Sequence, residues 1–323
     1  MDHILVAECC QNHNGSISIL KEMIKKASQA GATHVKMQTI FSKNLTFRPQ
    51  FEEGMRDLKD KLIYIKRPYK EEFKRLKSLE LNAKSHEIFI EECHKNNVIP
   101  LTTCFAHENI NFIKELGFST VKIASYDAAS YEMISNCIKS FDNIFISTGA
   151  SYDTEIKKLG EIINKNIPLL HCVTSYPNKC EDANIDRINF LKEFSDIIGF
   201  SDHTEYAVNK NEASLVAIFL GSKLIERHFT ILPSNETKDG RVSIDVKGLE
   251  ELNLFFSFSG DQQLEYLQKN YPKWERCIGN KKRVLTENEL LNRRYYKGRF
   301  ASPREIQFNT PPTEWIYNWE TYE

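Results

Sequence analysis

The chain alternates short apolar, β-prone runs with segments of helical spacing. Eight such runs occur, at residues 4–8, 34–38, 99–103, 121–125, 143–147, 168–172, 197–201 and 224–228. Between most of them apolar residues recur at i, i+3, i+4 and i+7. Leu20, Met23, Ile24 and Ala27 show this spacing, with Ser16 or Ser18 as the expected N-cap. The pattern predicts an α/β fold, a parallel (β/α)8 TIM barrel. A doubly wound open sheet is the alternative, weakened because no GxGxxG follows the first run.

Two stretches interrupt the alternation and set the domain prediction. Residues 1–285 are expected to form the catalytic barrel, and residues 286–323 a short irregular C-terminal extension. Residues 40–84 form a long loop insertion, with a helix expected at 69–79. Loops of this length in a compact enzyme usually carry function or act as a lid.

Composition narrows the classes of function and partner. The net charge is −1 and hydrophobic residues make up 41% of the 323 residues, so no nucleic-acid or membrane surface is indicated. The chain has no apolar run of about 18 residues and no signal peptide before the first apolar run. The eight cysteines are scattered without a CxxC motif. A cytoplasmic enzyme acting on small molecules is expected.

Two histidines suggest a metal site. His203 and His228 each follow an apolar run, and the runs lie one helix length apart, with Asp202 and Glu226 beside them. Neighbouring parallel strands would bring both imidazoles to one place, and neutral imidazole is a common ligand of divalent transition metals. The alternative is two ordinary histidines at strand ends.

The other expected strand ends also carry polar residues. In a barrel of this kind the active site lies at the carboxyl ends of the strands. These ends carry Glu8, Lys36, Gln38, Thr103, Lys122, Ser125, Ser147, His171 and Ser201. Lysines with hydroxyls suit a small phosphate or carboxylate next to a divalent metal. Taken singly, such lysines can reach solvent and such hydroxyls can cap helices.

Several of these segments, in this order, resemble the sialic acid (N-acetylneuraminate) synthase family. The matching stretches are Ala7-Glu8, Asn12-His13-Asn14-Gly15, Val35-Lys36-Met37-Gln38, Lys122-Ile123-Ala124-Ser125, Ser147-Thr148-Gly149, Tyr176-Pro177, Phe200-Ser201-Asp202-His203 and Glu226-Arg227-His228. The resemblance covers nearly the whole barrel. It implies that residues 286–323 are a vestigial remnant of the family's C-terminal antifreeze-like domain, which is otherwise lacking.

The resemblance implies a cytoplasmic homodimer that condenses phosphoenolpyruvate with an aldehyde sugar in surface polysaccharide or nonulosonic acid biosynthesis. The product would be a sialic-acid-like 2-keto-3-deoxy sugar acid plus phosphate. Lys36, Thr103, Lys122, Ser125, Ser147 and Ser201 would bind phosphoenolpyruvate, and His203 and His228 would hold Mn²⁺ or Mg²⁺. Glu8 would act as an acid/base or orienting group, and Glu226 and Asp239 would hold a water on the metal. Gln38, Tyr176 and Asp127 would face the sugar.

The chain also departs from that family. Cys10 occupies a position where the family has glycine, and Tyr126-Asp127 replaces Gly-Glu beside the acceptor pocket. Arg294, Arg299 or Arg304 is expected to replace an arginine of the missing domain. N-acetylmannosamine is therefore expected to be a poor acceptor. Two alternatives stay open, a Schiff-base aldolase using Lys122 or Lys36 and a non-catalytic barrel subunit.

Overall fold

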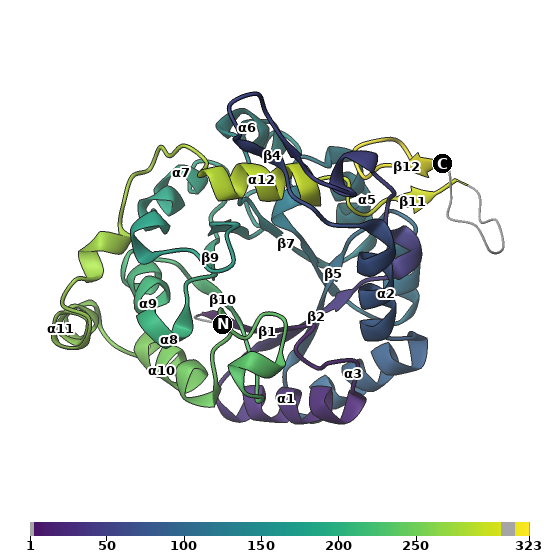
Figure 1. The fold of residues 1–323 in the computed structure, drawn as a ribbon. Helices are drawn as coiled ribbons and strands as arrows, with labels where there is room; N and C mark the ends of the chain where they lie inside the picture. Colours follow the sequence, from purple (N-terminus) through teal and green to yellow (C-terminus); the bar gives the residue numbers. More distant parts are fainter. Residues whose placement is uncertain (1–2, 305–313, 323) are drawn as a thin grey trace.

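The computed structural model describes residues 3–304 and 314–322 and contains a closed barrel of eight parallel strands. Neighbours around the barrel follow chain order, and β10 closes on β1 (Figure 1). The strands are β1 (Ile4–Cys10), β2 (His34–Thr39), β5 (Ile99–Cys104), β6 (Thr120–Ile123), β7 (Asn143–Ser147), β8 (Leu169–Cys172), β9 (Ile198–Asp202) and β10 (Leu224–His228). The predicted barrel is confirmed, and each strand overlaps one of the eight predicted runs.

Helices surround the barrel and separate its strands. They are α1 (Ile17–Gln29), α2 (Tyr69–Leu79), α3 (Ala83–Lys95), α4 (Asn109–Glu115), α5 (Tyr131–Ser140), α6 (Asp153–Gly160), α7 (Ile188–Leu191), α8 (Tyr206–Asn209), α9 (Glu212–Phe219), α10 (Val246–Phe256), α11 (Gly260–Asn270) and α12 (Glu287–Tyr296). In α1 the buried residues are the predicted Leu20, Met23, Ile24 and Ala27, and Ser16 is the N-cap. The amphipathic spacing therefore identified the face that packs against the strands.

The barrel interior has an apolar layer below a polar one. Val6, Leu101, Phe145, Leu170 and Leu224 form a small apolar cluster inside the barrel. The larger apolar core lies between the strands and the surrounding helices. Toward the carboxyl ends of the strands, the buried inward-facing residues include lysines, carboxylates and hydroxyls. The fold therefore brings the predicted site residues together on an apolar floor.

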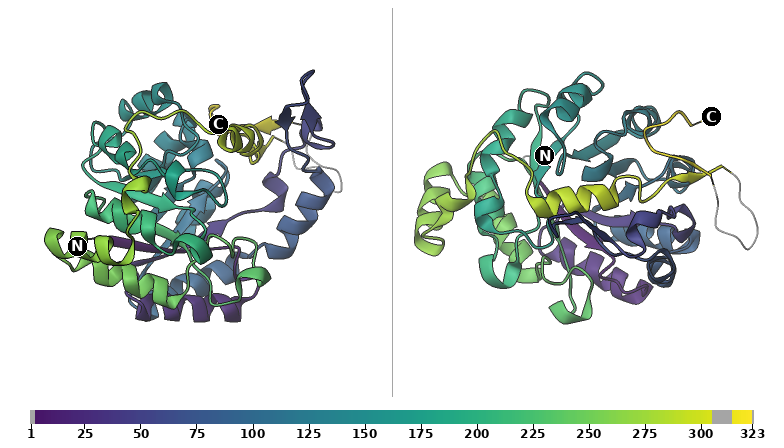
Figure 2. Two further views of the ribbon diagram at one scale, coloured as in Figure 1. Left: turned by 60° about the vertical axis from the view of Figure 1, so that its left-hand side comes forward. Right: turned by 45° about the horizontal axis from the view of Figure 1, so that its top comes forward.

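The long insertion and the C-terminal segment both lie over the carboxyl ends of the strands. The insertion contains the hairpin of β3 (Met55–Arg56) and β4 (Leu62–Tyr64), followed by α2 at the predicted residues. α12 lies beside this hairpin at the same end of the barrel (Figure 2). The C-terminal segment is more regular than expected, because α12 is a capped helix and β11 (Ser302–Pro303) pairs with β12 (Trp315–Ile316). No helix in the described ranges is long and apolar enough to cross a membrane.

Candidate active site at the carboxyl ends of the strands

Four buried charges form the centre of the site. Lys122 Nζ lies 2.9 and 2.8 Å from the two carboxylate oxygens of Glu226. Lys36 Nζ lies 3.7 Å from Glu226 Oε2 and makes a closer ion pair with Glu8. These side chains come from β1, β2, β6 and β10, and all are buried. Buried charges persist only when they are paired, so the two lysines and two carboxylates balance one another.

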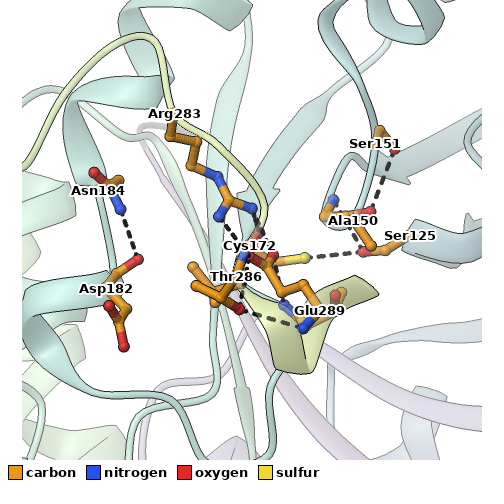
Figure 3. Close-up of polar contacts among 12 residues, drawn as sticks. Ser125, Ala150, Ser151, Cys172, Asp182, Asn184, Arg283, Thr286 and Glu289 are labelled. Atoms are coloured by element: carbon orange, nitrogen blue, oxygen red, sulfur yellow. Dashed lines mark hydrogen bonds and ion pairs between the residues drawn. The ribbon is translucent and has the colours of Figure 1, made fainter. Parts of the chain in front are cut away.

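Hydroxyl groups surround these charges. Lys36 Nζ donates to Thr103 Oγ1 at 3.2 Å, and Ser201 Oγ donates to Glu226 Oε1 at 2.8 Å. Ser125 Oγ accepts from the Gly149 N–H at 3.2 Å and lies 2.9 Å from Cys172 Sγ (Figure 3). Ser147 is buried at the end of β7. Five of the six residues predicted to bind phosphoenolpyruvate thus lie near or just beyond the carboxyl ends of their strands, and Lys36 lies in the middle of β2, with its ammonium group at Thr103.

Burial and pairing set the protonation of this cluster. Burial lowers the pKa of Lys36 to about 7, against the attraction of Glu226. Burial alone would raise the pKa of Glu226, but Lys122 and Lys36 together hold it well below its ordinary value. Glu226 therefore stays ionised and serves as the counterion of the lysines. Its predicted role beside a metal-bound water stays a prediction.

The two predicted metal histidines lie close together. Their ring centroids are 5.4 Å apart, and the ring of Tyr176 lies 4.4 Å from that of His203. His203 Nδ1 lies 3.0 Å from the Val173 carbonyl oxygen, so Nδ1 carries the proton and Nε2 keeps its lone pair. Asp202 does not join them, because its carboxylate pairs with Arg227 at 2.7 Å.

His228 has two further neighbours with potential ligand atoms. Its Nδ1 lies 3.7 Å from Asp239 Oδ2, and Cys10 Sγ lies 2.9 Å from the same oxygen. Burial and Asp239 raise the pKa of the Cys10 thiol well above its ordinary value. His228 Nδ1 is buried and has no hydrogen-bond partner among the described residues. An orphaned imidazole nitrogen beside a thiol and a carboxylate fits a divalent cation.

A cavity of about 340 Å³ opens beside these groups. Gln38 and Tyr176 line it as predicted, together with His228 and Asp239. Its remaining lining includes residues of the insertion, of the loop after β10 and of the C-terminal segment, namely Arg67, Arg75, Lys238, Arg241, Asn292, Tyr296 and Arg299. Arg67 and Arg75 were not among the predicted site residues, although the long insertion that carries them was expected to be functional.

Comparison with known proteins identifies the family. Residues 23–255 match the model of the NeuB family. The chain belongs to the NeuB family. It is 30% identical over 256 residues to N,N'-diacetyllegionaminic acid synthase of Campylobacter jejuni, covering 77% of this chain and 74% of that one. It is 28% identical over 307 residues to a Campylobacter jejuni pseudaminic acid synthase, covering 92% of this chain and 81% of that one.

A solved structure agrees with this assignment. The N-acetylneuraminic acid synthetase of Leptospira borgpetersenii, in complex with citrate, superposes with a TM-score of 0.68 at 26% identity. The match covers 84% of this chain and 93% of that one. These comparisons confirm the family resemblance that the sequence motifs indicated. They also confirm the predicted class of enzyme, a synthase of this family.

Within this NeuB barrel, Asp127, which was predicted to face the sugar, contacts the C-terminal segment and lines a small cavity beside the large one. Its carboxylate accepts from Asn318 Nδ2 at 2.9 Å and from Ser130 Oγ at 3.2 Å, and burial raises its pKa to about 6. It does not line the large cavity, whereas its neighbour Tyr126 does and stacks on Tyr296 with ring centroids 4.7 Å apart. Asp127 thus holds the C-terminal segment, because Asn318 belongs to that segment.

A buried ion pair anchors α12 over the NeuB barrel. Arg283 donates to the two Glu289 carboxylate oxygens at 2.6 and 2.7 Å, and Glu289 also accepts from the Thr174 N–H at 3.3 Å (Figure 3). Thr286 and Glu289 form a capping box at the start of the helix. Glu289 is completely buried, so these bonds fix the position of α12 above the end of β8.

The three arginines, one of which was expected to reach the sugar, differ in position. Arg299 lines the cavity and pairs with Glu72 of α2. Arg294 donates to the Ile63 carbonyl oxygen at 2.9 Å and so contacts the β3–β4 hairpin. Arg304 is exposed and does not line the cavity. Only Arg299 is placed where the prediction requires.

Proposed function

We propose that this protein condenses phosphoenolpyruvate with an aldehyde sugar to give a sialic-acid-like 2-keto-3-deoxy sugar acid and phosphate, in nonulosonic acid or surface polysaccharide biosynthesis. The buried cluster of Lys36, Lys122 and nearby hydroxyls, beside a cavity large enough for a sugar, carries the proposal. Two ammonium groups and several hydroxyls match the phosphate and carboxylate of phosphoenolpyruvate. The cavity would take the aldehyde next to it.

The lysines are paired with carboxylates before substrate binds. Glu226 and Glu8 neutralise Lys122 and Lys36, which keeps both ammonium groups in place in a buried layer. When phosphoenolpyruvate binds, its anionic groups become further partners of the same lysines. The lysines then stabilise charge on the leaving phosphate. Glu8 is held in turn by the Cys10 N–H at 2.5 Å, which suits an orienting role.

The bond changes balance without a further reactant except water. The methylene carbon of phosphoenolpyruvate attacks the aldehyde carbon and forms the new carbon–carbon bond. Water adds to the former enol carbon, and the resulting tetrahedral intermediate expels phosphate to leave the 2-keto acid. Holding both substrates in contact can lower the activation free energy of the condensation by roughly 7–11 kcal/mol.

His203 and His228, with Asp239 nearby, are the groups that would hold a divalent metal. When bound, such a metal supplies Lewis-acid polarisation of a carbonyl group. Mn²⁺ or Mg²⁺ is the ion expected from the resemblance. The cytoplasmic location and the homodimer expected from the sequence stay predictions.

The cavity wall indicates the chemistry of the acceptor. Its described lining contains five cationic side chains and one carboxylate, that of Asp239. The cationic residues are Arg67, Arg75, Lys238, Arg241 and Arg299. Arg75 and Arg299 pair with Glu72, and Arg241 pairs with Glu205. Arg67 and Lys238 have no ion-pair partner in the described ranges. Their charges favour an acceptor that carries an anionic group, such as a sugar phosphate.

The test is phosphate release from phosphoenolpyruvate against a panel of aldehyde sugars, with mass spectrometry of the products. The panel pairs each aldose with its phosphorylated form. Release of one phosphate from phosphoenolpyruvate per 2-keto acid formed is expected, and Lys122→Met should abolish it at ordinary substrate concentrations. No product from any aldose would overturn the proposal.

Borohydride reduction with a keto substrate tests the aldolase alternative. Burial lowers the pKa of Lys36 to about 7, which is the property that Schiff-base formation needs. Condensation of phosphoenolpyruvate forms no imine, so the expected result is no covalent adduct on Lys36 or Lys122. A trapped adduct on either lysine would favour the aldolase.

A further inference from the structure

Three side chains with different ligand chemistry meet at one wall of the cavity. Cys10 comes from the end of β1, His228 from the end of β10, and Asp239 from the loop after β10. Their potential ligand atoms all lie within 4.8 Å of one another. Cys10 Sγ is 2.9 Å and His228 Nδ1 is 3.7 Å from the same oxygen, Asp239 Oδ2.

These separations suit a single ion. A tetrahedral centre with bonds of about 2.0–2.3 Å places its ligand atoms roughly 3.3–3.8 Å apart. The nitrogen–oxygen separation lies within this range and the sulfur–oxygen separation lies slightly below it, so small side-chain adjustments would be enough. His228 is only 7% exposed, and its Nδ1 has no hydrogen-bond partner among the described residues. A buried, unsatisfied nitrogen next to the thiol and the carboxylate is an independent indication of a missing partner.

The backbone presents Cys10 to this position in an uncommon conformation. Cys10 has φ of 44°, in the left-handed region that favours glycine. The pairing of β1 with β2 also shifts register between Glu8 and Cys10, and such irregularities often redirect side chains beside active sites. Cys9 packs in the apolar core, whereas Cys10 lines the cavity. The strained position therefore holds a thiol that faces the site.

We propose that Cys10 completes, with His228 and Asp239, the site of the divalent cation beside His203, binding the ion through its thiolate, and that this makes the site prefer thiophilic ions such as Zn²⁺, Fe²⁺ or Co²⁺ over Mg²⁺. The role of this cation in the reaction rests on the proposed function, whereas the set of ligands rests only on the geometry of the three side chains. Binding forms the sulfur–metal bond and releases the thiol proton to solvent. Thiolate ligands select softer ions, while Mg²⁺ favours oxygen ligands.

A second thiol cluster provides the natural control. Cys180, Glu212 and Cys277 also have potential ligand atoms within 4.8 Å of one another. In that cluster, however, the Glu212 carboxylate already accepts from Arg276 at 2.5 and 3.1 Å. A guanidinium on the carboxylate opposes a cation there. Cys277→Ala is thus a matched variant that removes a buried thiol from the competing cluster.

The experiment adds Co²⁺ to the metal-free full-length protein and records the near-ultraviolet absorption that arises from sulfur-to-cobalt charge transfer. We expect a band whose intensity saturates at one Co²⁺ per chain. The band should be lost in Cys10→Ser and Cys10→Gly and kept in Cys277→Ala. Titration calorimetry should show that Cys10→Ser weakens Co²⁺ binding by more than about tenfold, at least the loss seen when an outer partner of a ligand is removed. Mg²⁺ binding should change little.

Cys10→Gly relieves the backbone conformation, so loss of the band in that variant cannot be attributed to misfolding if its circular dichroism matches the wild type. Absence of the band in the wild type, or its persistence in Cys10→Ser, would overturn the proposal while leaving the synthase function intact. A band with the expected behaviour but no condensation activity with any aldose would contradict the proposed function instead.

Discussion

At the scale of single residues, Lys36 links protonation to substrate binding. Its pKa is lowered by burial to about 7, so the free enzyme carries the ammonium form below that pH and loses it above. Because phosphoenolpyruvate is anionic, we expect kcat/KM for phosphoenolpyruvate to fall as pH rises through about 7. Lys36→Arg should move this fall to higher pH, since a guanidinium stays protonated. The measurement is the pH profile of kcat/KM for both proteins, and coincident profiles would exclude Lys36 as the titrating group.

Lys122 and Glu226 test the balance of charge in the site. Removing one member of a buried pair typically costs about 3–5 kcal/mol, because the partner is left as an unpaired charge. Lys122→Met should therefore destabilise the fold, and Glu226→Gln on the same background should restore part of the loss. In kinetics, Lys122→Met should raise KM for phosphoenolpyruvate far more than KM for the sugar. Equal effects on both substrates would show that Lys122 is only structural.

Asp127 is expected to make stability depend on pH. Its folded-state pKa of about 6 lies above its ordinary value of 3.8 because of burial. The stability that it contributes is thus fully present below about pH 4 and is lost as pH rises through about 6, a change of about 3 kcal/mol at most. Asp127→Asn keeps the acceptor oxygen for Asn318 and removes the titration. Urea unfolding from pH 4 to 7 should show a flatter profile for the variant.

The individual site residues were predictable to different degrees from sequence. Lys36 and Lys122 were found because each falls within an apolar run, and parallel strands bring such positions together. The contact of Cys10 with Asp239 was missed because it spans 229 residues of sequence. Arg67 and Arg75 were missed because no periodicity predicts where a long loop returns to a site. The contact of Asp127 with Asn318 was not predicted, because it joins two segments whose packing the sequence does not reveal.

At the scale of secondary structure, the regular elements were predictable and the covering elements were not. The strands and α1 follow hydrophobic periodicity, and α2 occupies its predicted residues. α12 was overlooked despite its capping box, because its sequence shows no continuous apolar stripe. Its position depends on Arg283 and Glu289, a pair whose burial is set by tertiary packing alone.

Glu289 is expected to govern the acceptor end of the cavity through α12. Asn292 and Tyr296 of this helix line the cavity, so freeing its anchor should displace them. Glu289→Gln should raise KM for the acceptor more than KM for phosphoenolpyruvate and should lower stability by about 3–5 kcal/mol, as for other broken buried pairs. Glu287→Gln, on the same helix but exposed, is the control and should change neither quantity. Equal changes in both variants would show that the anchor has no such role.

At the scale of the whole molecule, the barrel supplies the residues proposed to bind phosphoenolpyruvate, and the segments above it supply most of the wall of the proposed acceptor cavity. The insertion contributes Arg67 and Arg75, and the C-terminal segment contributes Tyr296 and Arg299. These segments are far apart in the sequence but lie side by side over the strand ends (Figure 2). Acceptor choice is therefore expected to depend on their packing, which the sequence alone does not reveal.

The final prediction concerns that choice. Tyr126 stacks on Tyr296 at the cavity wall and takes up space there, while Arg67 and Lys238 add positive charge. We expect N-acetylmannosamine to be a poor acceptor and a phosphorylated aldose to be preferred, because a clash and an unmatched charge both penalise the neutral sugar. Arg67→Ala and Lys238→Ala should lower kcat/KM for the phosphorylated acceptor by roughly tenfold each, about 1.4 kcal/mol, and leave neutral acceptors nearly unchanged. Lys66→Ala, next to Arg67 but paired with Glu53 on the surface, is the control. If N-acetylmannosamine is the best acceptor of the panel, the cationic wall has another purpose and Tyr126 does not restrict the pocket.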